Sequence, residues 1–160
     1  LKATGGGDDA LERAVLAVFL EVYAKNNTTL TRPYEGVVPA LEELRAKGIR
    51  LGICTNKPTA PAQDICDQLR LSPCFGVIIG AEADVPKKPD PQALMACLNR
   101  LDCLPEQAIY VGDSAIDFHT ARNSGVAFRL FSEGYLNHPL PELPAEARFD
   151  NWHNHGIVVG

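Results

Sequence analysis

Short apolar segments alternate with helical segments from Pro39 to Asp150, and this alternation constrains the fold more than any other feature of the chain. The first helical segment has Pro39 in its first turn and Gly48 just after its end, as helices commonly do. Strands that alternate with helices form a mostly parallel sheet with helices on its faces. The sequence therefore predicts an α/β fold with a Rossmann-like parallel sheet and flanking helices. We expect strands at residues 49–54, 77–79, 109–111, 126–131 and 148–150, and helices at residues 40–47, 59–69, 91–101 and 115–123.

A separate helical segment precedes the alternating region. Asp9 and Glu12 have the spacing of a capping box, and apolar residues then recur at helical spacing through Val22. Residues 26–34 have the composition of a linker. We expect two parts, a helical segment at residues 1–32 and the α/β core at residues 33–160.

The composition argues against several classes of protein. Of the 160 residues, 46% are hydrophobic and 22% are charged, which is typical of a folded globular domain and not of a disordered chain. The formal charge of −5, without a basic cluster, argues against a nucleic-acid partner and against an anionic membrane surface. No apolar run reaches the ~18 residues of a membrane span. Five cysteines without a C-x-x-C pair are typical of a reduced, cytoplasmic protein.

Polar residues follow the first predicted strand, in the segment Thr55-Asn56-Lys57-Pro58. A hydroxyl and free backbone N–H groups at a strand-to-helix turn can bind an anion. The alternative is that Thr55 is an ordinary N-cap of the next helix. Considered alone, this segment favours the N-cap.

A lysine follows the second predicted strand, in a loop with two prolines. Pro86 and Pro89 restrict the backbone around Lys88, so its side chain is aimed and not free. A lysine aimed into a site can neutralise a phosphate. The alternative is a solvated loop lysine before a helix capped by Asp90, and we expect that state for Lys87.

Two aspartates follow the third predicted strand, in the segment Gly112-Asp113-Ser114-Ala115-Ile116-Asp117. Asp113 lies at the strand tip, and Asp117 returns to the same side one helical turn later. Two such carboxylates suit Mg²⁺, which takes one or two carboxylates together with waters and phosphate. The alternative, an N-cap aspartate with an exposed aspartate in the first turn, is equally compatible with this segment alone. Together, however, a hydroxyl, a lysine and an acidic pair at successive strand ends predict a site for phosphate and magnesium.

These three segments, in this order, resemble the second, third and fourth motifs of the haloacid-dehalogenase-like (HAD) hydrolase superfamily. The closer resemblance is to its phosphoglycolate phosphatases, and it extends from Arg32 to Asp150. A weaker similarity relates residues 1–32 to part of that family's α-helical cap. The matching segments are ICTNKP at residues 53–58, KKPDP at 87–91 and VGDSAID at 111–117.

The resemblance implies a role for each site residue. Thr55 would bind the transferring phosphoryl group, aided by the backbone of Asn56, and Lys88 would balance its charge, so that Thr55 and Lys88 would be the catalytic residues. Asp113 and Asp117 would hold the Mg²⁺ cofactor. The implied activity is hydrolysis of a small phosphate monoester, 2-phosphoglycolate in the closest resemblance, through an aspartyl-phosphate intermediate.

The sequence departs from the family at the first motif, D-x-D-G-T, which carries the nucleophile and the general acid–base on the central strand. That motif is not in these 160 residues, and Asp8-Asp9, on a predicted helix, cannot replace it. We therefore expect a truncated phosphatase that lacks its nucleophile and central strand and is inactive and poorly stable alone. The alternatives are a remnant that binds phosphate and Mg²⁺ without turnover, and a phosphatase for another sugar or small-molecule phosphate.

Other candidates carry less weight. The paired acids argue against a metal-free dehalogenase, and a flavodoxin-like cofactor binder would not explain Lys88 together with Asp117. His153 and His155 have no acidic or thiolate company, so we expect a solvated tail there. We expect Trp152 to pack the last segment against the core. Tyr135 either approaches the rim of the site or packs as an ordinary core residue.

Overall fold

The computed structural model describes residues 31–136 and 138–157. The chain divides into two compact units, residues 1–32 and residues 33–160. The helix expected after Asp9 lies outside the described residues, so its assignment to a cap stays a prediction. The description below concerns the second unit. None of the helices in the described ranges is both long and apolar enough to span a membrane.

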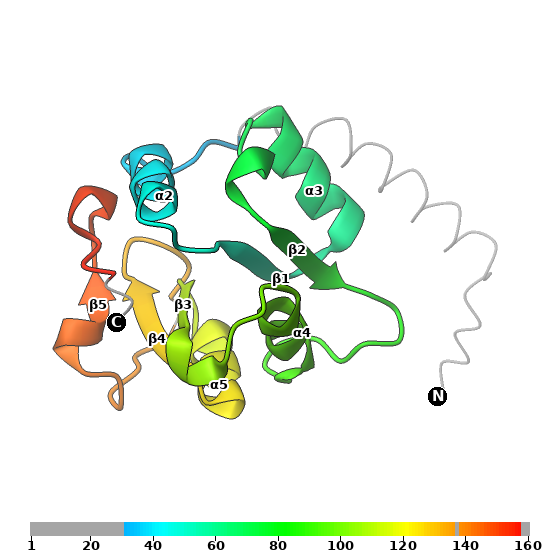
Figure 1. The fold of residues 1–160 in the computed structure, drawn as a ribbon. Coiled ribbons are helices and arrows are strands. Elements are labelled where there is room, and N and C mark those ends of the chain that lie inside the picture. Colours follow the sequence, from blue (N-terminus) through cyan, green and yellow to red (C-terminus); the bar gives the residue numbers. More distant parts are fainter. Residues whose placement is uncertain (1–30, 137, 158–160) are drawn as a thin grey trace, which may run out of the picture. The chain divides into compact units, whose positions relative to one another are not determined.

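Strands and helices alternate in this unit as the sequence predicts (Figure 1). The strands are β1 (Gly52–Pro58), β2 (Val77–Ala81), β3 (Ile109–Gly112), β4 (Ala127–Phe131) and β5 (Arg148–Phe149). The helices are α2 (Val37–Ala46), α3 (Thr59–Gln68), α4 (Gln92–Arg100) and α5 (Ala115–Ser124). Short 3₁₀ turns are η1 (Ser72–Cys74), η2 (Pro105–Gln107), η3 (Ala145–Ala147) and η4 (Trp152–Asn154).

The described strands form two parallel sheets and not one. β1 pairs with β2, starting with Gly52 opposite Val77, and the second sheet has the order β3-β4-β5. Both sheets are parallel throughout, as expected from the helices that join successive strands. The predicted α/β architecture with parallel strands is therefore confirmed, but its sheet is divided between β1 and β3.

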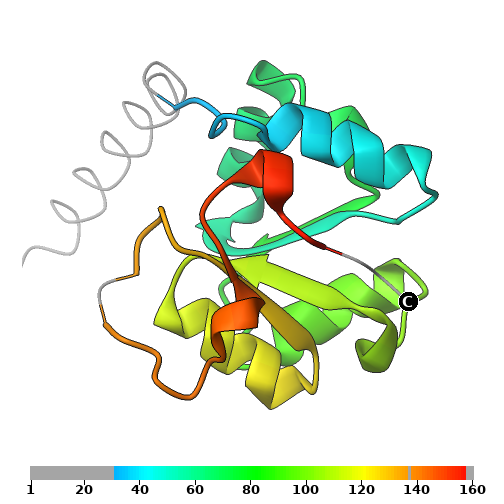
Figure 2. The ribbon, with the colours of Figure 1, turned by 90° about the vertical axis from the view of Figure 1, so that its left-hand side faces the viewer.

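Helices cover the two sheets. In Figure 1, α3 and α4 lie on opposite sides of the β1-β2 pair, and both helices pack against it. α5 packs against β3 and β4 and also contacts α4, so one helical layer passes below both sheets. Figure 2 shows α2 beside the η4 turn, which it contacts.

In the described part of the chain, two apolar clusters hold these layers together. One lies where α4 meets β1 and β2 and includes Leu94, Cys97 and Cys54. The other lies under α5 and includes Phe118 and Leu130. All five cysteines are free, and Cys54, Cys66 and Cys97 are buried, as expected for small core residues.

The first strand begins and ends later in the sequence than expected, at Gly52–Pro58 and not at residues 49–54. Pairing with β2 sets this boundary, because the ladder begins at Gly52 and resumes, after an irregularity, at Pro58. Thr55 therefore lies inside β1, and the residue at the N-cap of α3 is Pro58. The alternative that Thr55 caps the next helix is wrong. The other boundaries agree with the sequence to within a few residues, including Gly125, which ends α5 in the left-handed region.

The last segment packs against the core through aromatic rings. The ring of Trp152 lies 5.5 Å from that of Phe131 and 5.0 Å from that of Phe149, between centroids, which confirms the predicted packing. Nδ1 of His155, a buried residue, accepts a hydrogen bond from the backbone of Ile157 at 2.9 Å. His155 therefore belongs to the packed end of the described chain and is not a solvated tail residue.

Candidate active site

Lys88 is the centre of the candidate site. Its ammonium nitrogen lies 2.6 Å from Oδ1 of Asp117, 2.9 Å from the hydroxyl of Tyr110 and 3.3 Å from the carbonyl oxygen of Cys54. An ammonium has three N–H donors, and each of these oxygens can accept one. The side chains of Lys88 and Asp117 are each only 9% exposed. The predicted lysine is thus buried, aimed and paired with one of the two predicted aspartates.

Asn56 fixes the backbone at Lys88. Its side-chain nitrogen donates to the carbonyl of Lys88 at 3.1 Å, and its oxygen accepts from the backbone N–H of Lys88 at 2.8 Å. These two hydrogen bonds join the loop after β2 to the end of β1. The polar segment that contains Asn56 therefore helps to position Lys88. The sequence analysis expected a role for the backbone of Asn56 and missed this role of its side chain.

Thr55 precedes Asn56 in β1. Its hydroxyl accepts a hydrogen bond from the backbone N–H of Lys57 at 3.1 Å, and its side chain is partly buried. Cys54, directly before it, contributes the carbonyl that Lys88 contacts. Thr55 therefore lies one residue from the Lys88 contact, while its hydroxyl is engaged within its own turn.

Asp117 is held in place from three sides. Oδ2 accepts from the hydroxyl of Ser114 at 2.7 Å and from the backbone N–H of Asp113 at 3.2 Å, while Oδ1 faces Lys88. Burial raises the pKa of Asp117, but the Lys88 ammonium and these hydrogen bonds outweigh it and hold the pKa below its ordinary value. Asp117 is therefore an ionised, buried partner of Lys88.

Asp113 lies at the tip of β3, as expected, in a different electrostatic environment. Burial raises its pKa, the backbone N–H of Tyr135 lowers it, and the negative charge of Asp117 raises it, with a net rise. The Tyr135 contact to Oδ2 is long, at 3.3 Å, and the Tyr135 side chain is 74% exposed. Asp113 is thus a carboxylate whose negative charge the described residues do not fully balance.

Local sequence explains how the two carboxylates meet. A side chain at Gly112 would collide with Asp117, so only glycine lets the strand end approach the first turn of α5 this closely. Ser114 is the N-cap of α5 and accepts from the backbone N–H of Asp117 at 3.3 Å. Gly134 makes a similar close approach to Asp113 from the loop after β4.

Tyr110 is a site residue that the sequence analysis missed. Its hydroxyl contacts Lys88 and also lies 3.2 Å from Oδ1 of Asp117 and 3.0 Å from the carbonyl of Cys54. Burial and the charge of Asp117 raise its pKa, so the phenol stays neutral. The residue lies two positions before the predicted Gly112-Asp113 pair, where its apolar neighbours made it look like an ordinary strand residue.

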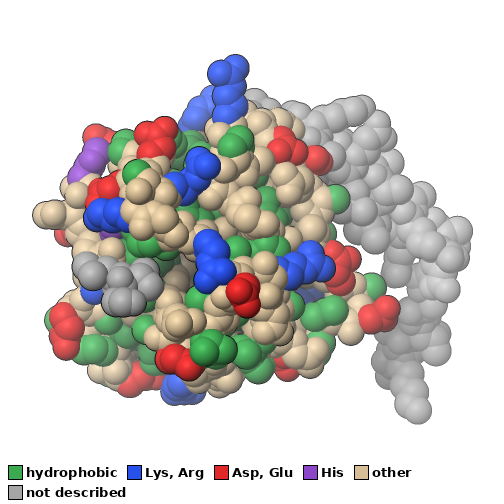
Figure 3. All heavy atoms as spheres, viewed as in Figure 1, with side chains coloured by type: hydrophobic (Ala, Val, Ile, Leu, Met, Phe, Trp, Pro, Cys, Tyr) green, Lys and Arg blue, Asp and Glu red, His purple; other side chains and the backbone are tan. Residues whose placement is uncertain are grey.

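A cavity of about 760 Å³ lies between β1 and β3 and reaches these residues. Its polar end includes Lys88, Asp113 and Asp117, and the remainder is mostly apolar. Figure 3 shows acidic and basic side chains interspersed over the face seen in Figure 1. The arrangement offers a buried cation, two carboxylates and a space beside them.

The carboxylates fit a hard divalent cation. Within residues 31–136 and 138–157 no three His, Cys, Asp or Glu side chains form a ready-made metal cluster. Mg²⁺ does not need one, because it takes one or two carboxylates and completes its shell with water and substrate phosphate. The unbalanced charge of Asp113 next to ionised Asp117 is what such a cation would neutralise.

Comparison with known sequences places the chain among hydrolases. The sequence profile of the haloacid dehalogenase-like hydrolase family matches residues 6–131. A phosphoglycolate phosphatase of Cereibacter sphaeroides is 40% identical over 152 residues, which cover 94% of this chain and 69% of the relative. A phosphoglycolate phosphatase of Rhodospirillum rubrum is 39% identical over 153 residues, covering 96% of this chain and 64% of the relative. The chain thus spans about two thirds of these relatives' length.

Solved structures agree with this assignment. A predicted phosphoglycolate phosphatase from Haemophilus somnus is 30% identical with a TM-score of 0.77, over 84% of this chain and 60% of that one. A HAD-superfamily hydrolase from Geobacter sulfurreducens is 28% identical with a TM-score of 0.73, over 93% of this chain and 72% of that one. Profile, relatives and fold agree: the chain belongs to the haloacid dehalogenase-like hydrolases.

Proposed function

We propose that this protein is part of a Mg²⁺-dependent phosphatase that hydrolyses a small phosphate monoester, with 2-phosphoglycolate as the substrate. One observation carries the proposal: buried Lys88 is paired with Asp117, and Asp113 stands beside that pair with its charge only partly balanced. A phosphate dianion needs both a cation and a metal clamp, and this arrangement supports both. The relatives described as phosphoglycolate phosphatases, at 40% and 39% identity, support the choice of substrate.

Each predicted residue has a place in this proposal. Thr55 and the backbone of Asn56 bind the phosphoryl oxygens, and Lys88 neutralises the negative charge that builds up during transfer. Lys88 then gives up its longest contact, the one at 3.3 Å to the Cys54 carbonyl, to donate to the phosphate. Asp113 and Asp117 would hold Mg²⁺, which would neutralise charge at the phosphate oxygens when bound.

The nucleophile in this proposal is an aspartate outside the 160 residues. Its carboxylate oxygen attacks phosphorus, the bond from phosphorus to the substrate oxygen breaks, and the leaving alkoxide takes a proton from a second acid. Water then gives a proton back to that second acid and attacks the phosphorus of the aspartyl phosphate; the bond from phosphorus to the aspartate oxygen breaks, which releases inorganic phosphate and the free carboxylate. Lys88 and Thr55 stabilise the phosphoryl group in both steps.

Phosphate release from 2-phosphoglycolate tests this proposal. We expect no release by the 160-residue chain with Mg²⁺, and turnover after fusion to the part of the Cereibacter sphaeroides relative that lies outside the match. The fusion with Asp113→Asn is the matched control and should lose activity. Phosphate release by the unfused chain would contradict the claim that the nucleophile lies outside the 160 residues. A fusion that folds but stays inactive would contradict the proposed phosphatase activity.

A second candidate is a module that binds phosphate and Mg²⁺ without turnover. The observation that favours it is that the described residues contain the binding groups but not the D-x-D-G-T motif. Phosphate binding by the unfused chain, together with an inactive fusion, would support this candidate over the phosphatase.

A further inference from the structure

The hydroxyl of Tyr110 lies among the three polar contacts of Lys88. Its oxygen is 2.9 Å from the Lys88 ammonium nitrogen. It is also 3.0 Å from the carbonyl oxygen of Cys54 and 3.2 Å from Oδ1 of Asp117. An ammonium only donates, whereas a phenol accepts and has one proton to donate. Tyr110 therefore accepts from Lys88, and its own proton goes to one of the two remaining oxygens.

The distances favour the Cys54 carbonyl as the acceptor of that proton. O–H···O hydrogen bonds are usually about 2.5–3.0 Å long, a range that includes the contact to Cys54 and excludes the one to Asp117. Both oxygens of Asp117 also have closer donors, the Lys88 ammonium at 2.6 Å and the Ser114 hydroxyl at 2.7 Å. Tyr110 is thus the main hydrogen-bond donor to the Cys54 carbonyl from this side of β1.

Lys88 makes a weaker contact with the same carbonyl. Its distance of 3.3 Å is beyond the usual N–H···O range of about 2.7–3.2 Å. Cys54 is buried, and a buried carbonyl that loses its donors costs free energy. Because Tyr110 already supplies a donor, Lys88 can withdraw its N–H without leaving this carbonyl unpaired. One of the three N–H groups of Lys88 is therefore available for another acceptor.

Packing holds the ring of Tyr110 independently of its hydroxyl. The ring lies against the apolar cluster that includes Leu94 and Cys97, and its centroid is 6.3 Å from that of Phe128. These contacts fix the direction in which the hydroxyl points. Phenylalanine at this position would keep them and remove the hydroxyl alone.

We propose that Tyr110 is a positioning residue for Lys88, which releases one N–H of the lysine to a bound phosphate. The Tyr110 hydroxyl holds the ammonium and keeps the Cys54 carbonyl paired while Lys88 turns from that carbonyl to a phosphate oxygen. Lys88 then donates to Asp117, Tyr110 and the phosphate, and the phenol and the ammonium keep all their protons. This inference rests on the proposed function and deepens it, since it names the group that lets a fully engaged lysine accept a substrate.

Calorimetric titration of the 160-residue chain with inorganic phosphate in Mg²⁺ tests this role. In Tyr110→Phe, Lys88 is the donor left for the Cys54 carbonyl, so we expect phosphate to bind roughly tenfold more weakly or worse. Mg²⁺ titrated without phosphate should bind within about twofold of the parent affinity, because Asp117 stays paired with Lys88. Tyr110→para-aminophenylalanine restores an N–H donor at the same place and should recover most of the phosphate affinity.

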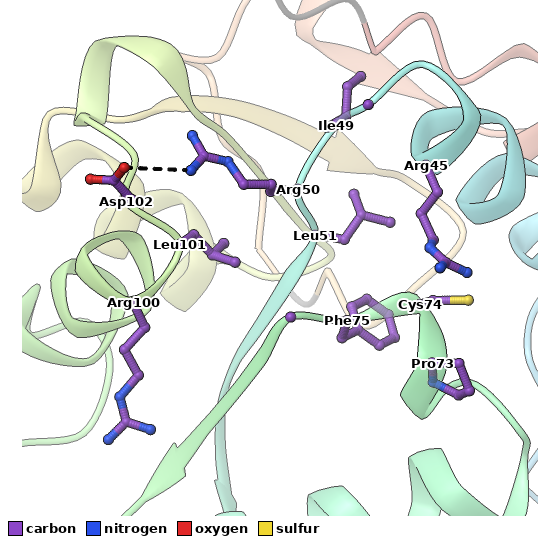
Figure 4. Close-up of a pocket in the computed structure, with 12 residues that line it drawn as sticks. Arg45, Ile49, Arg50, Leu51, Pro73, Cys74, Phe75, Arg100, Leu101 and Asp102 are labelled. Atoms are coloured by element: carbon purple, nitrogen blue, oxygen red, sulfur yellow. Dashed lines mark ion pairs between the residues drawn. The ribbon is translucent and has the colours of Figure 1, made fainter.

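A second cavity requires a control for the place where phosphate binds. This cavity, of about 530 Å³, is lined by residues that precede β1 and β2 and by Arg45, Arg50 and Arg100 (Figure 4). Arg50 forms an ion pair with Asp102 at 3.9 Å, so the control leaves it in place. Arg45→Gln combined with Arg100→Gln should bind phosphate like the parent. A loss of phosphate affinity in this double variant would place the phosphate in the arginine-lined cavity and overturn the proposal.

The remaining outcomes separate the role of Tyr110 from the proposed function. Unchanged phosphate affinity in Tyr110→Phe would overturn the role of Tyr110 and leave the proposed function intact. Equal losses of phosphate and Mg²⁺ affinity, without recovery in the para-aminophenylalanine variant, would show a structural role and overturn the proposal as well. A parent chain that binds no phosphate would refute the proposed function, and the role of Tyr110 with it.

Discussion

The electrostatics of the candidate site depend on three side chains: Lys88, Asp113 and Asp117. Lys88 and Asp117 form a buried ion pair at 2.6 Å, in which each charge compensates the desolvation of the other. Among the described residues Asp113 forms no such ion pair, and burial, followed by the charge of Asp117, raises its pKa. The sequence singles out all three residues as candidates, because glycine, proline and a strand end mark their positions. It could not show which aspartate pairs with the lysine, since that depends on contacts between distant segments.

Lys88→Met should destabilise the fold strongly. It leaves Asp117 buried without its cation, and breaking a buried pair from one side costs about 3 kcal/mol or more. Urea unfolding at neutral pH measures the loss. The double variant Lys88→Met with Asp117→Asn is the control and should recover part of it, because no uncompensated charge is left. If the double variant lost as much free energy of unfolding as the two single variants together, the result would contradict the pairing of Lys88 with Asp117.

Asp113→Asn should have the opposite effect on stability in the absence of metal. A pKa raised by folding means that the ionised carboxylate is less favourable in the folded state, so at neutral pH it lowers stability. We predict a melting temperature higher by roughly 2 °C without Mg²⁺, and loss of the stabilisation that Mg²⁺ gives the parent chain. Thermal unfolding with and without Mg²⁺ checks both effects. A variant that Mg²⁺ still stabilises fully would show that Asp113 is not a ligand.

At the scale of elements, periodicity and turn residues were enough to predict the order and type of the described strands and helices. The turn from β3 into α5 was the clearest case, because Gly112 and Ser114 mark a tight exit and an N-cap. The start of β1 was predicted too early, since pairing with β2 defines it and no local signal does. The sequence did not predict the hydrogen bonds of the Asn56 side chain to the Lys88 backbone or of Lys88 to the Tyr110 hydroxyl. The reason is the same, because these contacts join segments far apart in the sequence.

The loop after β4 provides a test of how elements position Asp113. A methyl group at Gly134 would collide with the Asp113 side chain, so Gly134→Ala should displace that carboxylate. We predict roughly tenfold weaker Mg²⁺ binding, about 1.4 kcal/mol, by calorimetry, with little change in the unfolding midpoint because the loop is partly exposed. Glu133→Gln, in the same exposed loop, is the control and should bind Mg²⁺ like the parent. Unchanged affinity in Gly134→Ala would place the metal away from Asp113.

At the scale of the whole molecule, the division of the sheet is the feature with the widest consequences. The resemblance of the sequence to a family with a central strand predicts an incomplete sheet, and the strands within residues 31–136 and 138–157 form two parallel sheets with a cavity between them. The length and walls of that cavity could not be predicted from sequence, because they depend on how α4 and the two sheets pack.

Acid should weaken the whole fold in part through Asp117. Its folded-state pKa is lowered, so its contribution is present above the unfolded value of about 3.9 and is lost as pH falls through the lower folded value. We predict that the free energy of unfolding, measured in urea, drops more steeply below about pH 4 in the parent chain than in Asp117→Asn. Parallel pH profiles for the two proteins would contradict an ionised Asp117 in the folded state.

The most direct test of the candidate site is calorimetric titration of the 160-residue chain with inorganic phosphate, with and without Mg²⁺, beside Asp113→Asn. We predict that phosphate binds in the presence of Mg²⁺ and binds at least roughly tenfold more weakly when Mg²⁺ is left out or Asp113 is replaced. Phosphate affinity that is unchanged by both would show that Lys88, Asp113 and Asp117 do not form a joint phosphate and magnesium site.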